Sequence, residues 1–156
     1  MRPVLAALLL LGAPARGDDL AARAARACPL VPRAPALAVG ESGDVTVAIA
    51  CESGVHVQRQ APLRVAASAS PGLALERARL GWDDVRGTRD TPEVRVPVTA
   101  AAPGAAEVRL RLQYFACSEE WCVRQERELV VPVAVREAPA GPSPRGDPSA
   151  SAPTSG

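Results

Sequence analysis

Apolar and polar residues alternate along several short segments of this chain, and this alternation constrains the fold more than any other feature. The clearest case is the segment 106–116. Its apolar members are Val108, Leu110, Leu112 and Tyr114, and its polar members are Arg109, Arg111 and Gln113. Successive side chains of a β-strand point to opposite faces, so this pattern predicts a strand with one buried and one solvated face.

The same pattern recurs in segments 45–51, 63–67, 73–75, 94–98 and 129–135, which Gly- and Pro-containing turns separate. Pro97, on the polar side of its segment, indicates an edge strand because proline cannot donate to a strand ladder. With two shorter candidates, the chain has about seven strands and no convincing amphipathic helix. We therefore predict an all-β fold, an immunoglobulin-like antiparallel β-sandwich of about seven strands.

The two ends of the sequence differ from this pattern. Residues 1–17 read as a signal peptide, because a short apolar run precedes small residues suited to cleavage near Ala15 to Gly17. Residues 18–28 are expected to form a flexible lead-in, 29–136 the folded domain, and 137–156 a disordered tail rich in Pro, Gly, Ser and Ala. The mature protein should be exported to the periplasm or otherwise secreted, without a membrane span, as a monomer.

Composition narrows the choice of function. The hydrophobic fraction of 47% is enough for a core, although only 3% of residues are aromatic. The net charge of +1 argues against nucleic acid as a partner. The single histidine, His56, would with Cys117 and Cys122 be one ligand short of a closed zinc site, and no cofactor is expected.

Four cysteines in an exported chain allow three complete pairings. Cys117 and Cys122 follow and precede predicted strands, so a hairpin would bring them together with Ser118 to Trp121 at its tip. Cys28 and Cys51 are then left for a second, structural disulfide. Cys51 shares the buried side of its strand, and it could equally be a small core residue with a free thiol.

A bond between Cys117 and Cys122 would close a very short loop, for which chain entropy gives only about 2 kcal/mol of stabilisation. Such a bond is a candidate for reversible chemistry, although a structural staple is the usual role in small exported domains. Glu119 and Glu120 should raise the pKa values of the thiols, and neither a helix N-terminus nor a nearby histidine is visible to lower them. We expect the pair to be attacked by a partner's thiolate.

Aromatic residues surround the same pair. Phe115 and Trp121 could shield the sulfurs or form a docking patch, and Tyr114, Glu119 and Glu120 are the other candidates for that role. Plain packing at the end of the sandwich explains the two aromatic side chains equally well.

The segment "LRLQYFACSEEWCVRQERELVVPVAV" combines a strand ending in Ala-Cys, a short acidic loop, a second Cys and an apolar strand. It resembles the amino-terminal domain of the thiol:disulfide interchange protein DsbD family, and "SGVHVQRQAPLRVAAS" is similar to a second segment of that family. The resemblance covers residues 43–135. It implies an immunoglobulin-like fold and a redox-active pair, Cys117 and Cys122, that relays electrons from a thioredoxin-like periplasmic protein to oxidised partners.

Two hypotheses follow. The first is an exported thiol-disulfide interchange domain, which as an enzyme would be a component of the protein-disulfide reductase type. The second is a non-catalytic immunoglobulin-like binding module whose disulfides are structural.

Overall fold

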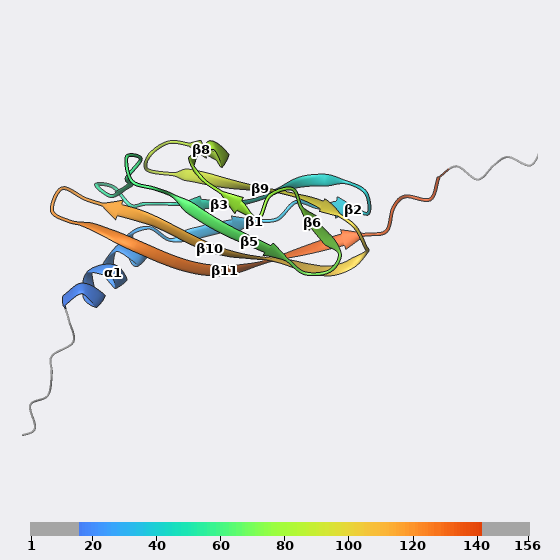
Figure 1. The fold of residues 1–156 in the computed structure, drawn as a ribbon, viewed down its shortest axis with the longest axis horizontal. Coiled ribbons are helices and arrows are strands. Elements are labelled where there is room, and N and C mark those ends of the chain that lie inside the picture. The colour runs from blue at the N-terminus through green and yellow to red at the C-terminus, as the bar shows by residue number, and fades with distance from the viewer. Residues whose placement is uncertain (1–15, 142–156) are drawn as a thin grey trace, which may run out of the picture.

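The computed structural model describes residues 16–141, so residues 1–15 of the expected signal peptide and residues 142–156 of the expected tail lie outside it. Two sheets pack face to face (Figure 1). The first sheet contains β1 (Leu30–Arg33), β3 (Ser42–Ile49), β9 (Pro92–Ala100), β6 (Leu73–Leu75) and β8 (Val85–Gly87). The second contains β2 (Leu37–Ala38), β11 (Cys122–Arg136), β10 (Gly104–Cys117), β5 (Arg64–Ala69), β7 (Arg79–Leu80) and β4 (His56–Val57).

This arrangement confirms the predicted all-β, immunoglobulin-like sandwich. Neighbouring strands are antiparallel except for β2, which runs parallel to the end of β11. Several of the strands are only two to four residues long, and hydrophobic periodicity predicts such short strands least accurately. A 3₁₀ turn, η1 (Trp82–Asp84), connects β7 to β8. Within the described range no helix is long and apolar enough to cross a membrane.

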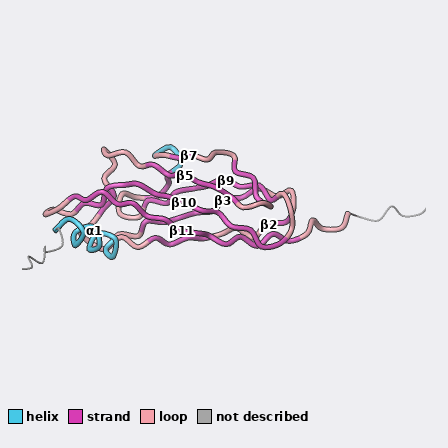
Figure 2. The backbone as a smooth tube through the Cα atoms, turned by 60° about the horizontal axis from the view of Figure 1, so that its bottom comes forward, coloured by secondary structure: helices cyan, strands magenta, loops and turns pink. Residues whose placement is uncertain are grey.

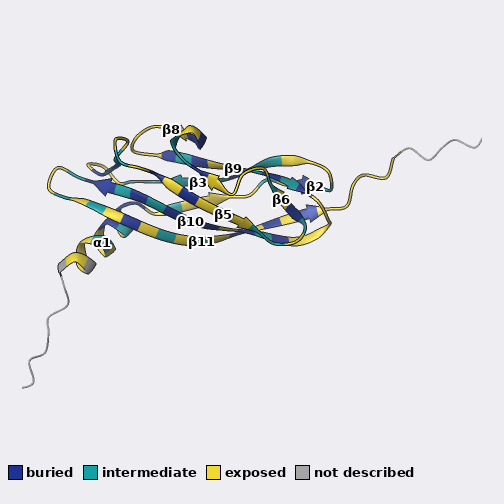
Figure 3. Ribbon diagram, viewed as in Figure 1, coloured by how far each residue is buried: buried dark blue, intermediate teal, exposed yellow. Residues whose placement is uncertain are grey.

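The core lies between the sheets and is built from the apolar side of each alternating strand. Buried and exposed residues alternate along β10 and β11 (Figure 3). The fully buried residues include Val45, Val47 and Ile49 of β3, Val94 and Val96 of β9, and Val108 and Leu112 of β10. The predicted strand faces are therefore confirmed. Most of the core residues are Val, Leu and Ala, so many small side chains replace a few large aromatic ones.

The prediction that Pro97 marks an edge strand is wrong. The strand that contains it, β9, lies inside its sheet, with β3 on one side and both β6 and β8 on the other. The carbonyl of Pro97 accepts a hydrogen bond of 3.4 Å from the backbone N–H of Glu76. In an antiparallel strand, the nitrogen and the carbonyl of one residue face the same neighbouring strand. The nitrogen of Pro97, which has no hydrogen to donate, therefore faces the gap between the end of β8 and the start of β6, where no ladder hydrogen bond is needed.

The expected flexible lead-in is instead part of a helix, α1 (Arg16–Ala27), and this is the main correction to the predicted fold. Ala24, Ala27 and Cys28 are buried at helical spacing and join the core. Gln125 donates a hydrogen bond of 3.2 Å to the carbonyl of Ala21, and Arg127 donates one of 3.3 Å to that of Ala25. The helix therefore packs against β11, at the end of the sandwich that also carries the β10–β11 hairpin tip (Figures 1 and 2).

The packing of α1 gives a matched test on one helix. Replacing buried Ala24 with Glu should cost about 2–3 kcal/mol of unfolding free energy, because an unpaired carboxylate would enter the core. The same replacement at exposed Ala22 should change it by less than about 0.5 kcal/mol. Urea unfolding of both variants measures the difference, and equal effects would show that α1 is not packed as described.

Candidate functional site

The β10–β11 hairpin places Cys117 and Cys122 opposite each other at its tip. The two strands pair without interruption from Gly104 and Val135 to Cys117 and Cys122, and the two cysteines are joined by a disulfide. The turn between them has hydrogen bonds of its own. The backbone N–H of Ser118 donates to the carbonyl of Trp121 at 2.7 Å, and the Ser118 hydroxyl accepts from the N–H of Glu120 at 3.2 Å. The tip is thus held by its backbone as well as by its disulfide.

Cys28 and Cys51 form the second disulfide, as predicted, so Cys51 is not a free thiol. This bond joins the end of α1 to the segment that follows β3. Two backbone hydrogen bonds flank it, from Glu52 N–H to the Ala27 carbonyl at 2.8 Å and from Ala50 N–H to the Pro29 carbonyl at 2.9 Å. Cys28 is completely buried. Two disulfides are typical of a protein that matures outside the cytoplasm.

The two sulfurs of the hairpin pair differ in exposure. Cys117 is only 4% exposed, whereas Cys122 is an exposed residue. Residues directly opposite each other in an antiparallel pair point to the same face, and here that is the outer face of the second sheet. Phe115 and Arg124 form the next pair on this face. A reagent arriving from solvent therefore meets Cys122 before Cys117.

The structure also brings a histidine to the pair, which the sequence analysis had missed. The short strand β4 pairs with the end of β10 so that His56 lies directly opposite Cys117. One guanidinium nitrogen of Arg89 lies 3.4 Å from Nδ1 of His56. The expectation that no histidine is near the cysteines is thus wrong. Sixty-one positions separate His56 from Cys117 in the chain, and only the β4–β10 pairing joins them.

An open depression of about 730 Å³ lies beside this group. Its lining includes Cys51, Glu52, His56, Arg89, Asp90 and Glu119. Among residues 16–141, no group of three or more His, Cys, Asp or Glu side chains is arranged to hold a metal ion. The chemistry available here is that of the sulfurs and of the basic side chains beside them.

The five residues proposed for docking or shielding fall into different environments. Glu119 and Glu120 are exposed at the tip, and Phe115 is half-buried on the outer face. Trp121 is half-buried against the core, with the guanidinium of Arg23 from α1 5.9 Å from its ring centroid. Tyr114 is buried and cannot belong to a docking patch. Trp121 therefore joins the hairpin tip to α1, and Phe115 is the aromatic residue beside the disulfide.

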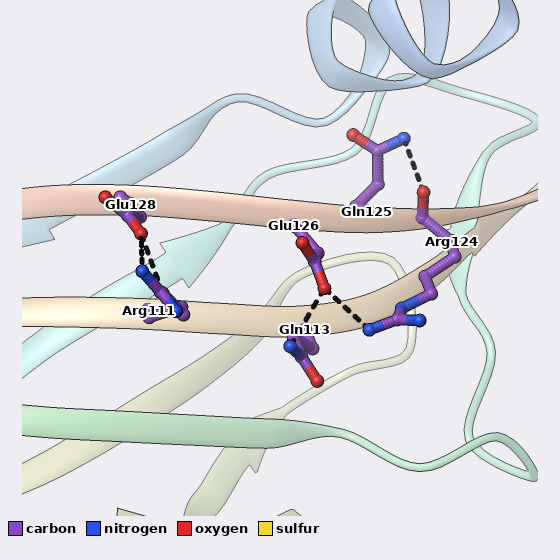
Figure 4. A network of polar contacts seen from close by, with 6 residues as sticks. All are labelled: Arg111, Gln113, Arg124, Gln125, Glu126 and Glu128. Carbon is purple, nitrogen blue, oxygen red and sulfur yellow. Dashed lines mark hydrogen bonds and ion pairs between the residues drawn. The ribbon is translucent and has the colours of Figure 1, made fainter. Parts of the chain in front are cut away.

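The outer face next to the disulfide carries charges that are already paired (Figure 4). Arg111 donates to Glu128 at 2.7 Å, while Gln113 and Arg124 both donate to Glu126, at 2.9 and 2.6 Å. Such exposed pairs contribute little to stability. They leave the strand side of Cys122 with paired charges, whereas Glu119 and Glu120 are exposed at the tip.

Burial raises the pKa of the Tyr114 hydroxyl above its ordinary value of 10.0, and the nearby Arg127 guanidinium offsets part of the rise. This hydroxyl has no hydrogen-bond partner among the described residues. Its burial is therefore compensated only in part, by the nearby charge of Arg127.

The comparisons with known proteins show no match to a family model or to a curated protein. Among solved structures, the chain is similar to native Escherichia coli alpha-2-macroglobulin from domain MG7 to the C-terminus, at 20% identity and a TM-score of 0.47, over 72% of this chain and 17% of that one. Domains 4 and 5 of the S-layer protein SbsC match at 14% identity and a TM-score of 0.33, over 69% of this chain and 51% of that one. The chain thus spans a small part of the first structure and half of the second.

The raised pKa of Tyr114 predicts how stability depends on pH. Above pH 10 the unfolded chain loses the phenol proton while the folded protein keeps it, so Tyr114 should make stability fall as pH rises beyond that value. Tyr114→Phe should remove this part of the slope and change stability at neutral pH by less than about 1 kcal/mol. Tyrosinate absorbance reports this group alone, because the chain has one tyrosine. If the Tyr114 hydroxyl of the folded protein titrates at its ordinary pKa, the side chain is not buried as described.

The two disulfides should differ in their contribution to stability. Their sequence separations of 23 and 5 predict chain-entropy terms of about 3.4 kcal/mol for Cys28–Cys51 and about 2 kcal/mol for Cys117–Cys122. Denaturant unfolding of two variants, each with one cysteine pair replaced by serines, measures the contribution of each disulfide to the free energy of unfolding. Loss of Cys28–Cys51 should cost more, because it closes the longer loop and is one of the links that hold α1 to the sandwich. A larger loss from the hairpin pair would identify that pair as the main staple.

Proposed function

We propose that this protein is a periplasmic thiol-disulfide interchange domain. Its Cys117–Cys122 pair would relay electrons from a thioredoxin-like donor to oxidised partner proteins. The observation that carries the proposal is the difference between the two disulfides of the same chain. In one, Cys28 is fully buried and Cys51 is partly buried, and the bond joins residues 23 positions apart. In the other, Cys117 is buried and Cys122 is exposed, and the bond closes the end of a long continuous ladder.

The Cys28–Cys51 disulfide has the features of a structural bond. Cys28 is shielded from solvent, and the bond reinforces the backbone hydrogen bonds that link the end of α1 to the segment after β3. The hairpin disulfide adds little to a tip that fourteen consecutive residue pairs already hold in register. A bond of small structural value with one exposed sulfur suits reversible exchange.

From the difference in exposure we infer a role for each cysteine. A partner thiolate attacks Cys122 Sγ, which forms a mixed disulfide and breaks the Cys117–Cys122 bond, and the bonding electron pair leaves on Cys117 Sγ as a thiolate. A second thiolate of the same partner then attacks the mixed disulfide and releases Cys122. The partner ends as a disulfide and this domain as a dithiol, so two electrons have moved. The reverse sequence delivers them to an oxidised protein.

The surroundings of Cys122 fit contact with a folded partner. Phe115 and Arg124 lie next to the pair on the outer face, and Arg124 is already neutralised by Glu126. On this side of the pair a partner would meet an aromatic side chain and a paired charge, whereas the tip presents the exposed Glu119 and Glu120.

A non-catalytic binding module with structural disulfides is the second candidate. The hydrogen-bonded turn at Ser118 and the packing of Trp121 on α1 favour it, because both make the tip rigid. The two candidates differ in one measurable property, which is whether the hairpin pair exchanges with a thiol protein while the buried pair does not.

The adduct formed with thioredoxin tests the proposal. Oxidised domain is mixed with reduced thioredoxin whose resolving cysteine has been replaced, and the reaction is quenched in acid, alkylated and digested. We expect a mixed disulfide through Cys122, alkylated Cys117, and an intact Cys28–Cys51 bond in mass spectra. The Cys117→Ser, Cys122→Ser double variant is the control and should form no adduct.

Reduction potentials provide the outcome that would reject the proposal. The hairpin pair should lie in the range of exchange proteins, about −270 to −120 mV, and the buried pair below about −300 mV. If the hairpin pair also lies below that limit and no thioredoxin adduct forms, the binding-module candidate stands instead.

A further inference from the structure

One end of the sandwich gathers the only histidine of the chain and an arginine around Cys117. His56 and Cys122 flank Cys117 on the two sides of β10, so the three residues form one row across β4, β10 and β11. Residues opposite each other in a sheet share a face and have Cβ atoms about 5 Å apart. The imidazole of His56 is therefore a lateral neighbour of the buried sulfur and not of the exposed one.

Backbone hydrogen bonds hold the histidine in this position. The N–H of Val57 donates to the Arg89 carbonyl at 3.1 Å, and the N–H of Cys51 donates to the Asp90 carbonyl at 3.1 Å. On its other side, β4 pairs with β10, and Gln58 N–H donates to the Phe115 carbonyl at 2.9 Å. The segment with His56 is thus fastened to both the 88–91 loop and the hairpin.

The contact with Arg89 selects the tautomer of the imidazole. A guanidinium group can only donate hydrogen bonds, so the 3.4 Å contact favours the tautomer in which Nδ1 of His56 accepts. The ring proton of the neutral imidazole is then on Nε2. An Nε2–H group is therefore available on the part of the ring that does not face Arg89.

We propose that His56 is the hydrogen-bond donor that stabilises the Cys117 thiolate when the Cys117–Cys122 bond opens. This inference rests on the proposed exchange function and adds a catalytic residue to it. As the partner thiolate bonds to Cys122 Sγ, the electron pair of the broken bond passes to Cys117 Sγ, and His56 Nε2–H donates to that sulfur. A hydrogen bond to the charged form makes Cys117 a better leaving group.

Some of the charges around the row would stabilise a Cys117 thiolate and others would destabilise it. Arg89 favours the thiolate, and part of its charge is offset by Asp90, whose carboxylate lies 3.5 Å from the guanidinium. Glu52 and Glu119 line the same depression and oppose the thiolate. In this acidic surrounding the donor on His56 provides a stabilisation that Arg89 alone does not supply.

Variants of His56 test the role of the donor. His56→Leu should slow reduction of the hairpin pair by dithiothreitol near neutral pH by about tenfold. In the Cys122→Ser background, with Cys28–Cys51 intact, it should move the thiolate absorbance titration of Cys117 to higher pH. His56→Gln keeps an N–H donor and should restore most of the rate. The control is Arg33→Leu, which removes an exposed charge from β1 and should change neither quantity.

An unchanged rate and titration in His56→Leu would overturn the inference, and so would a His56→Gln variant as slow as the Leu variant. If His56→Leu does not fold, Arg89→Leu replaces it. Loss of the contact that selects the tautomer should then slow reduction by about threefold, and no slowing would overturn the inference. The proposed function fails separately, when wild-type protein forms no thioredoxin adduct although the histidine still controls reduction by dithiothreitol.

Discussion

The ladder between β10 and β11 is the interaction on which the rest of this structure depends. It runs in one register along the length of the sandwich, from Gly104 and Val135 to Cys117 and Cys122. Its inner face supplies Val108, Leu112 and Val133 to the core, and its far end extends to meet α1. Because the register is continuous, the same alternation that buries the valines also sets the face on which the two cysteines lie.

The end of the sandwich near the hairpin tip is assembled from segments that are far apart in the chain. The disulfide between Cys28 and Cys51 fastens α1 to the segment after β3, and that segment leads directly to β4 and His56. The buried disulfide therefore supports the surroundings of the accessible one. Under the proposed function, the first bond would be structural and the second would be exchangeable.

The predictions from sequence were most accurate where a local pattern was sufficient. The buried faces of β3, β9, β10 and β11 follow from their period of two, and the hairpin around residues 117–122 follows from the two strands beside it. The helix α1 was missed although its polar and apolar residues lie on opposite sides, because its buried residues are mainly small alanines in a segment of low overall hydrophobicity. The edge assigned to Pro97 was wrong because one proline does not reveal that two short strands share one side of β9.

The sequence by itself determined the class of fold, the face of each long strand and the position of Cys117 and Cys122 at a hairpin tip. Alternation and turn residues act over a few neighbouring positions, and this is enough to specify those features. Only the tertiary structure decided that Cys28 pairs with Cys51, that Trp121 packs on α1, and that His56 lies opposite Cys117. These are contacts between segments separated by more than twenty residues, and they form only when the two sheets and the helix have packed together.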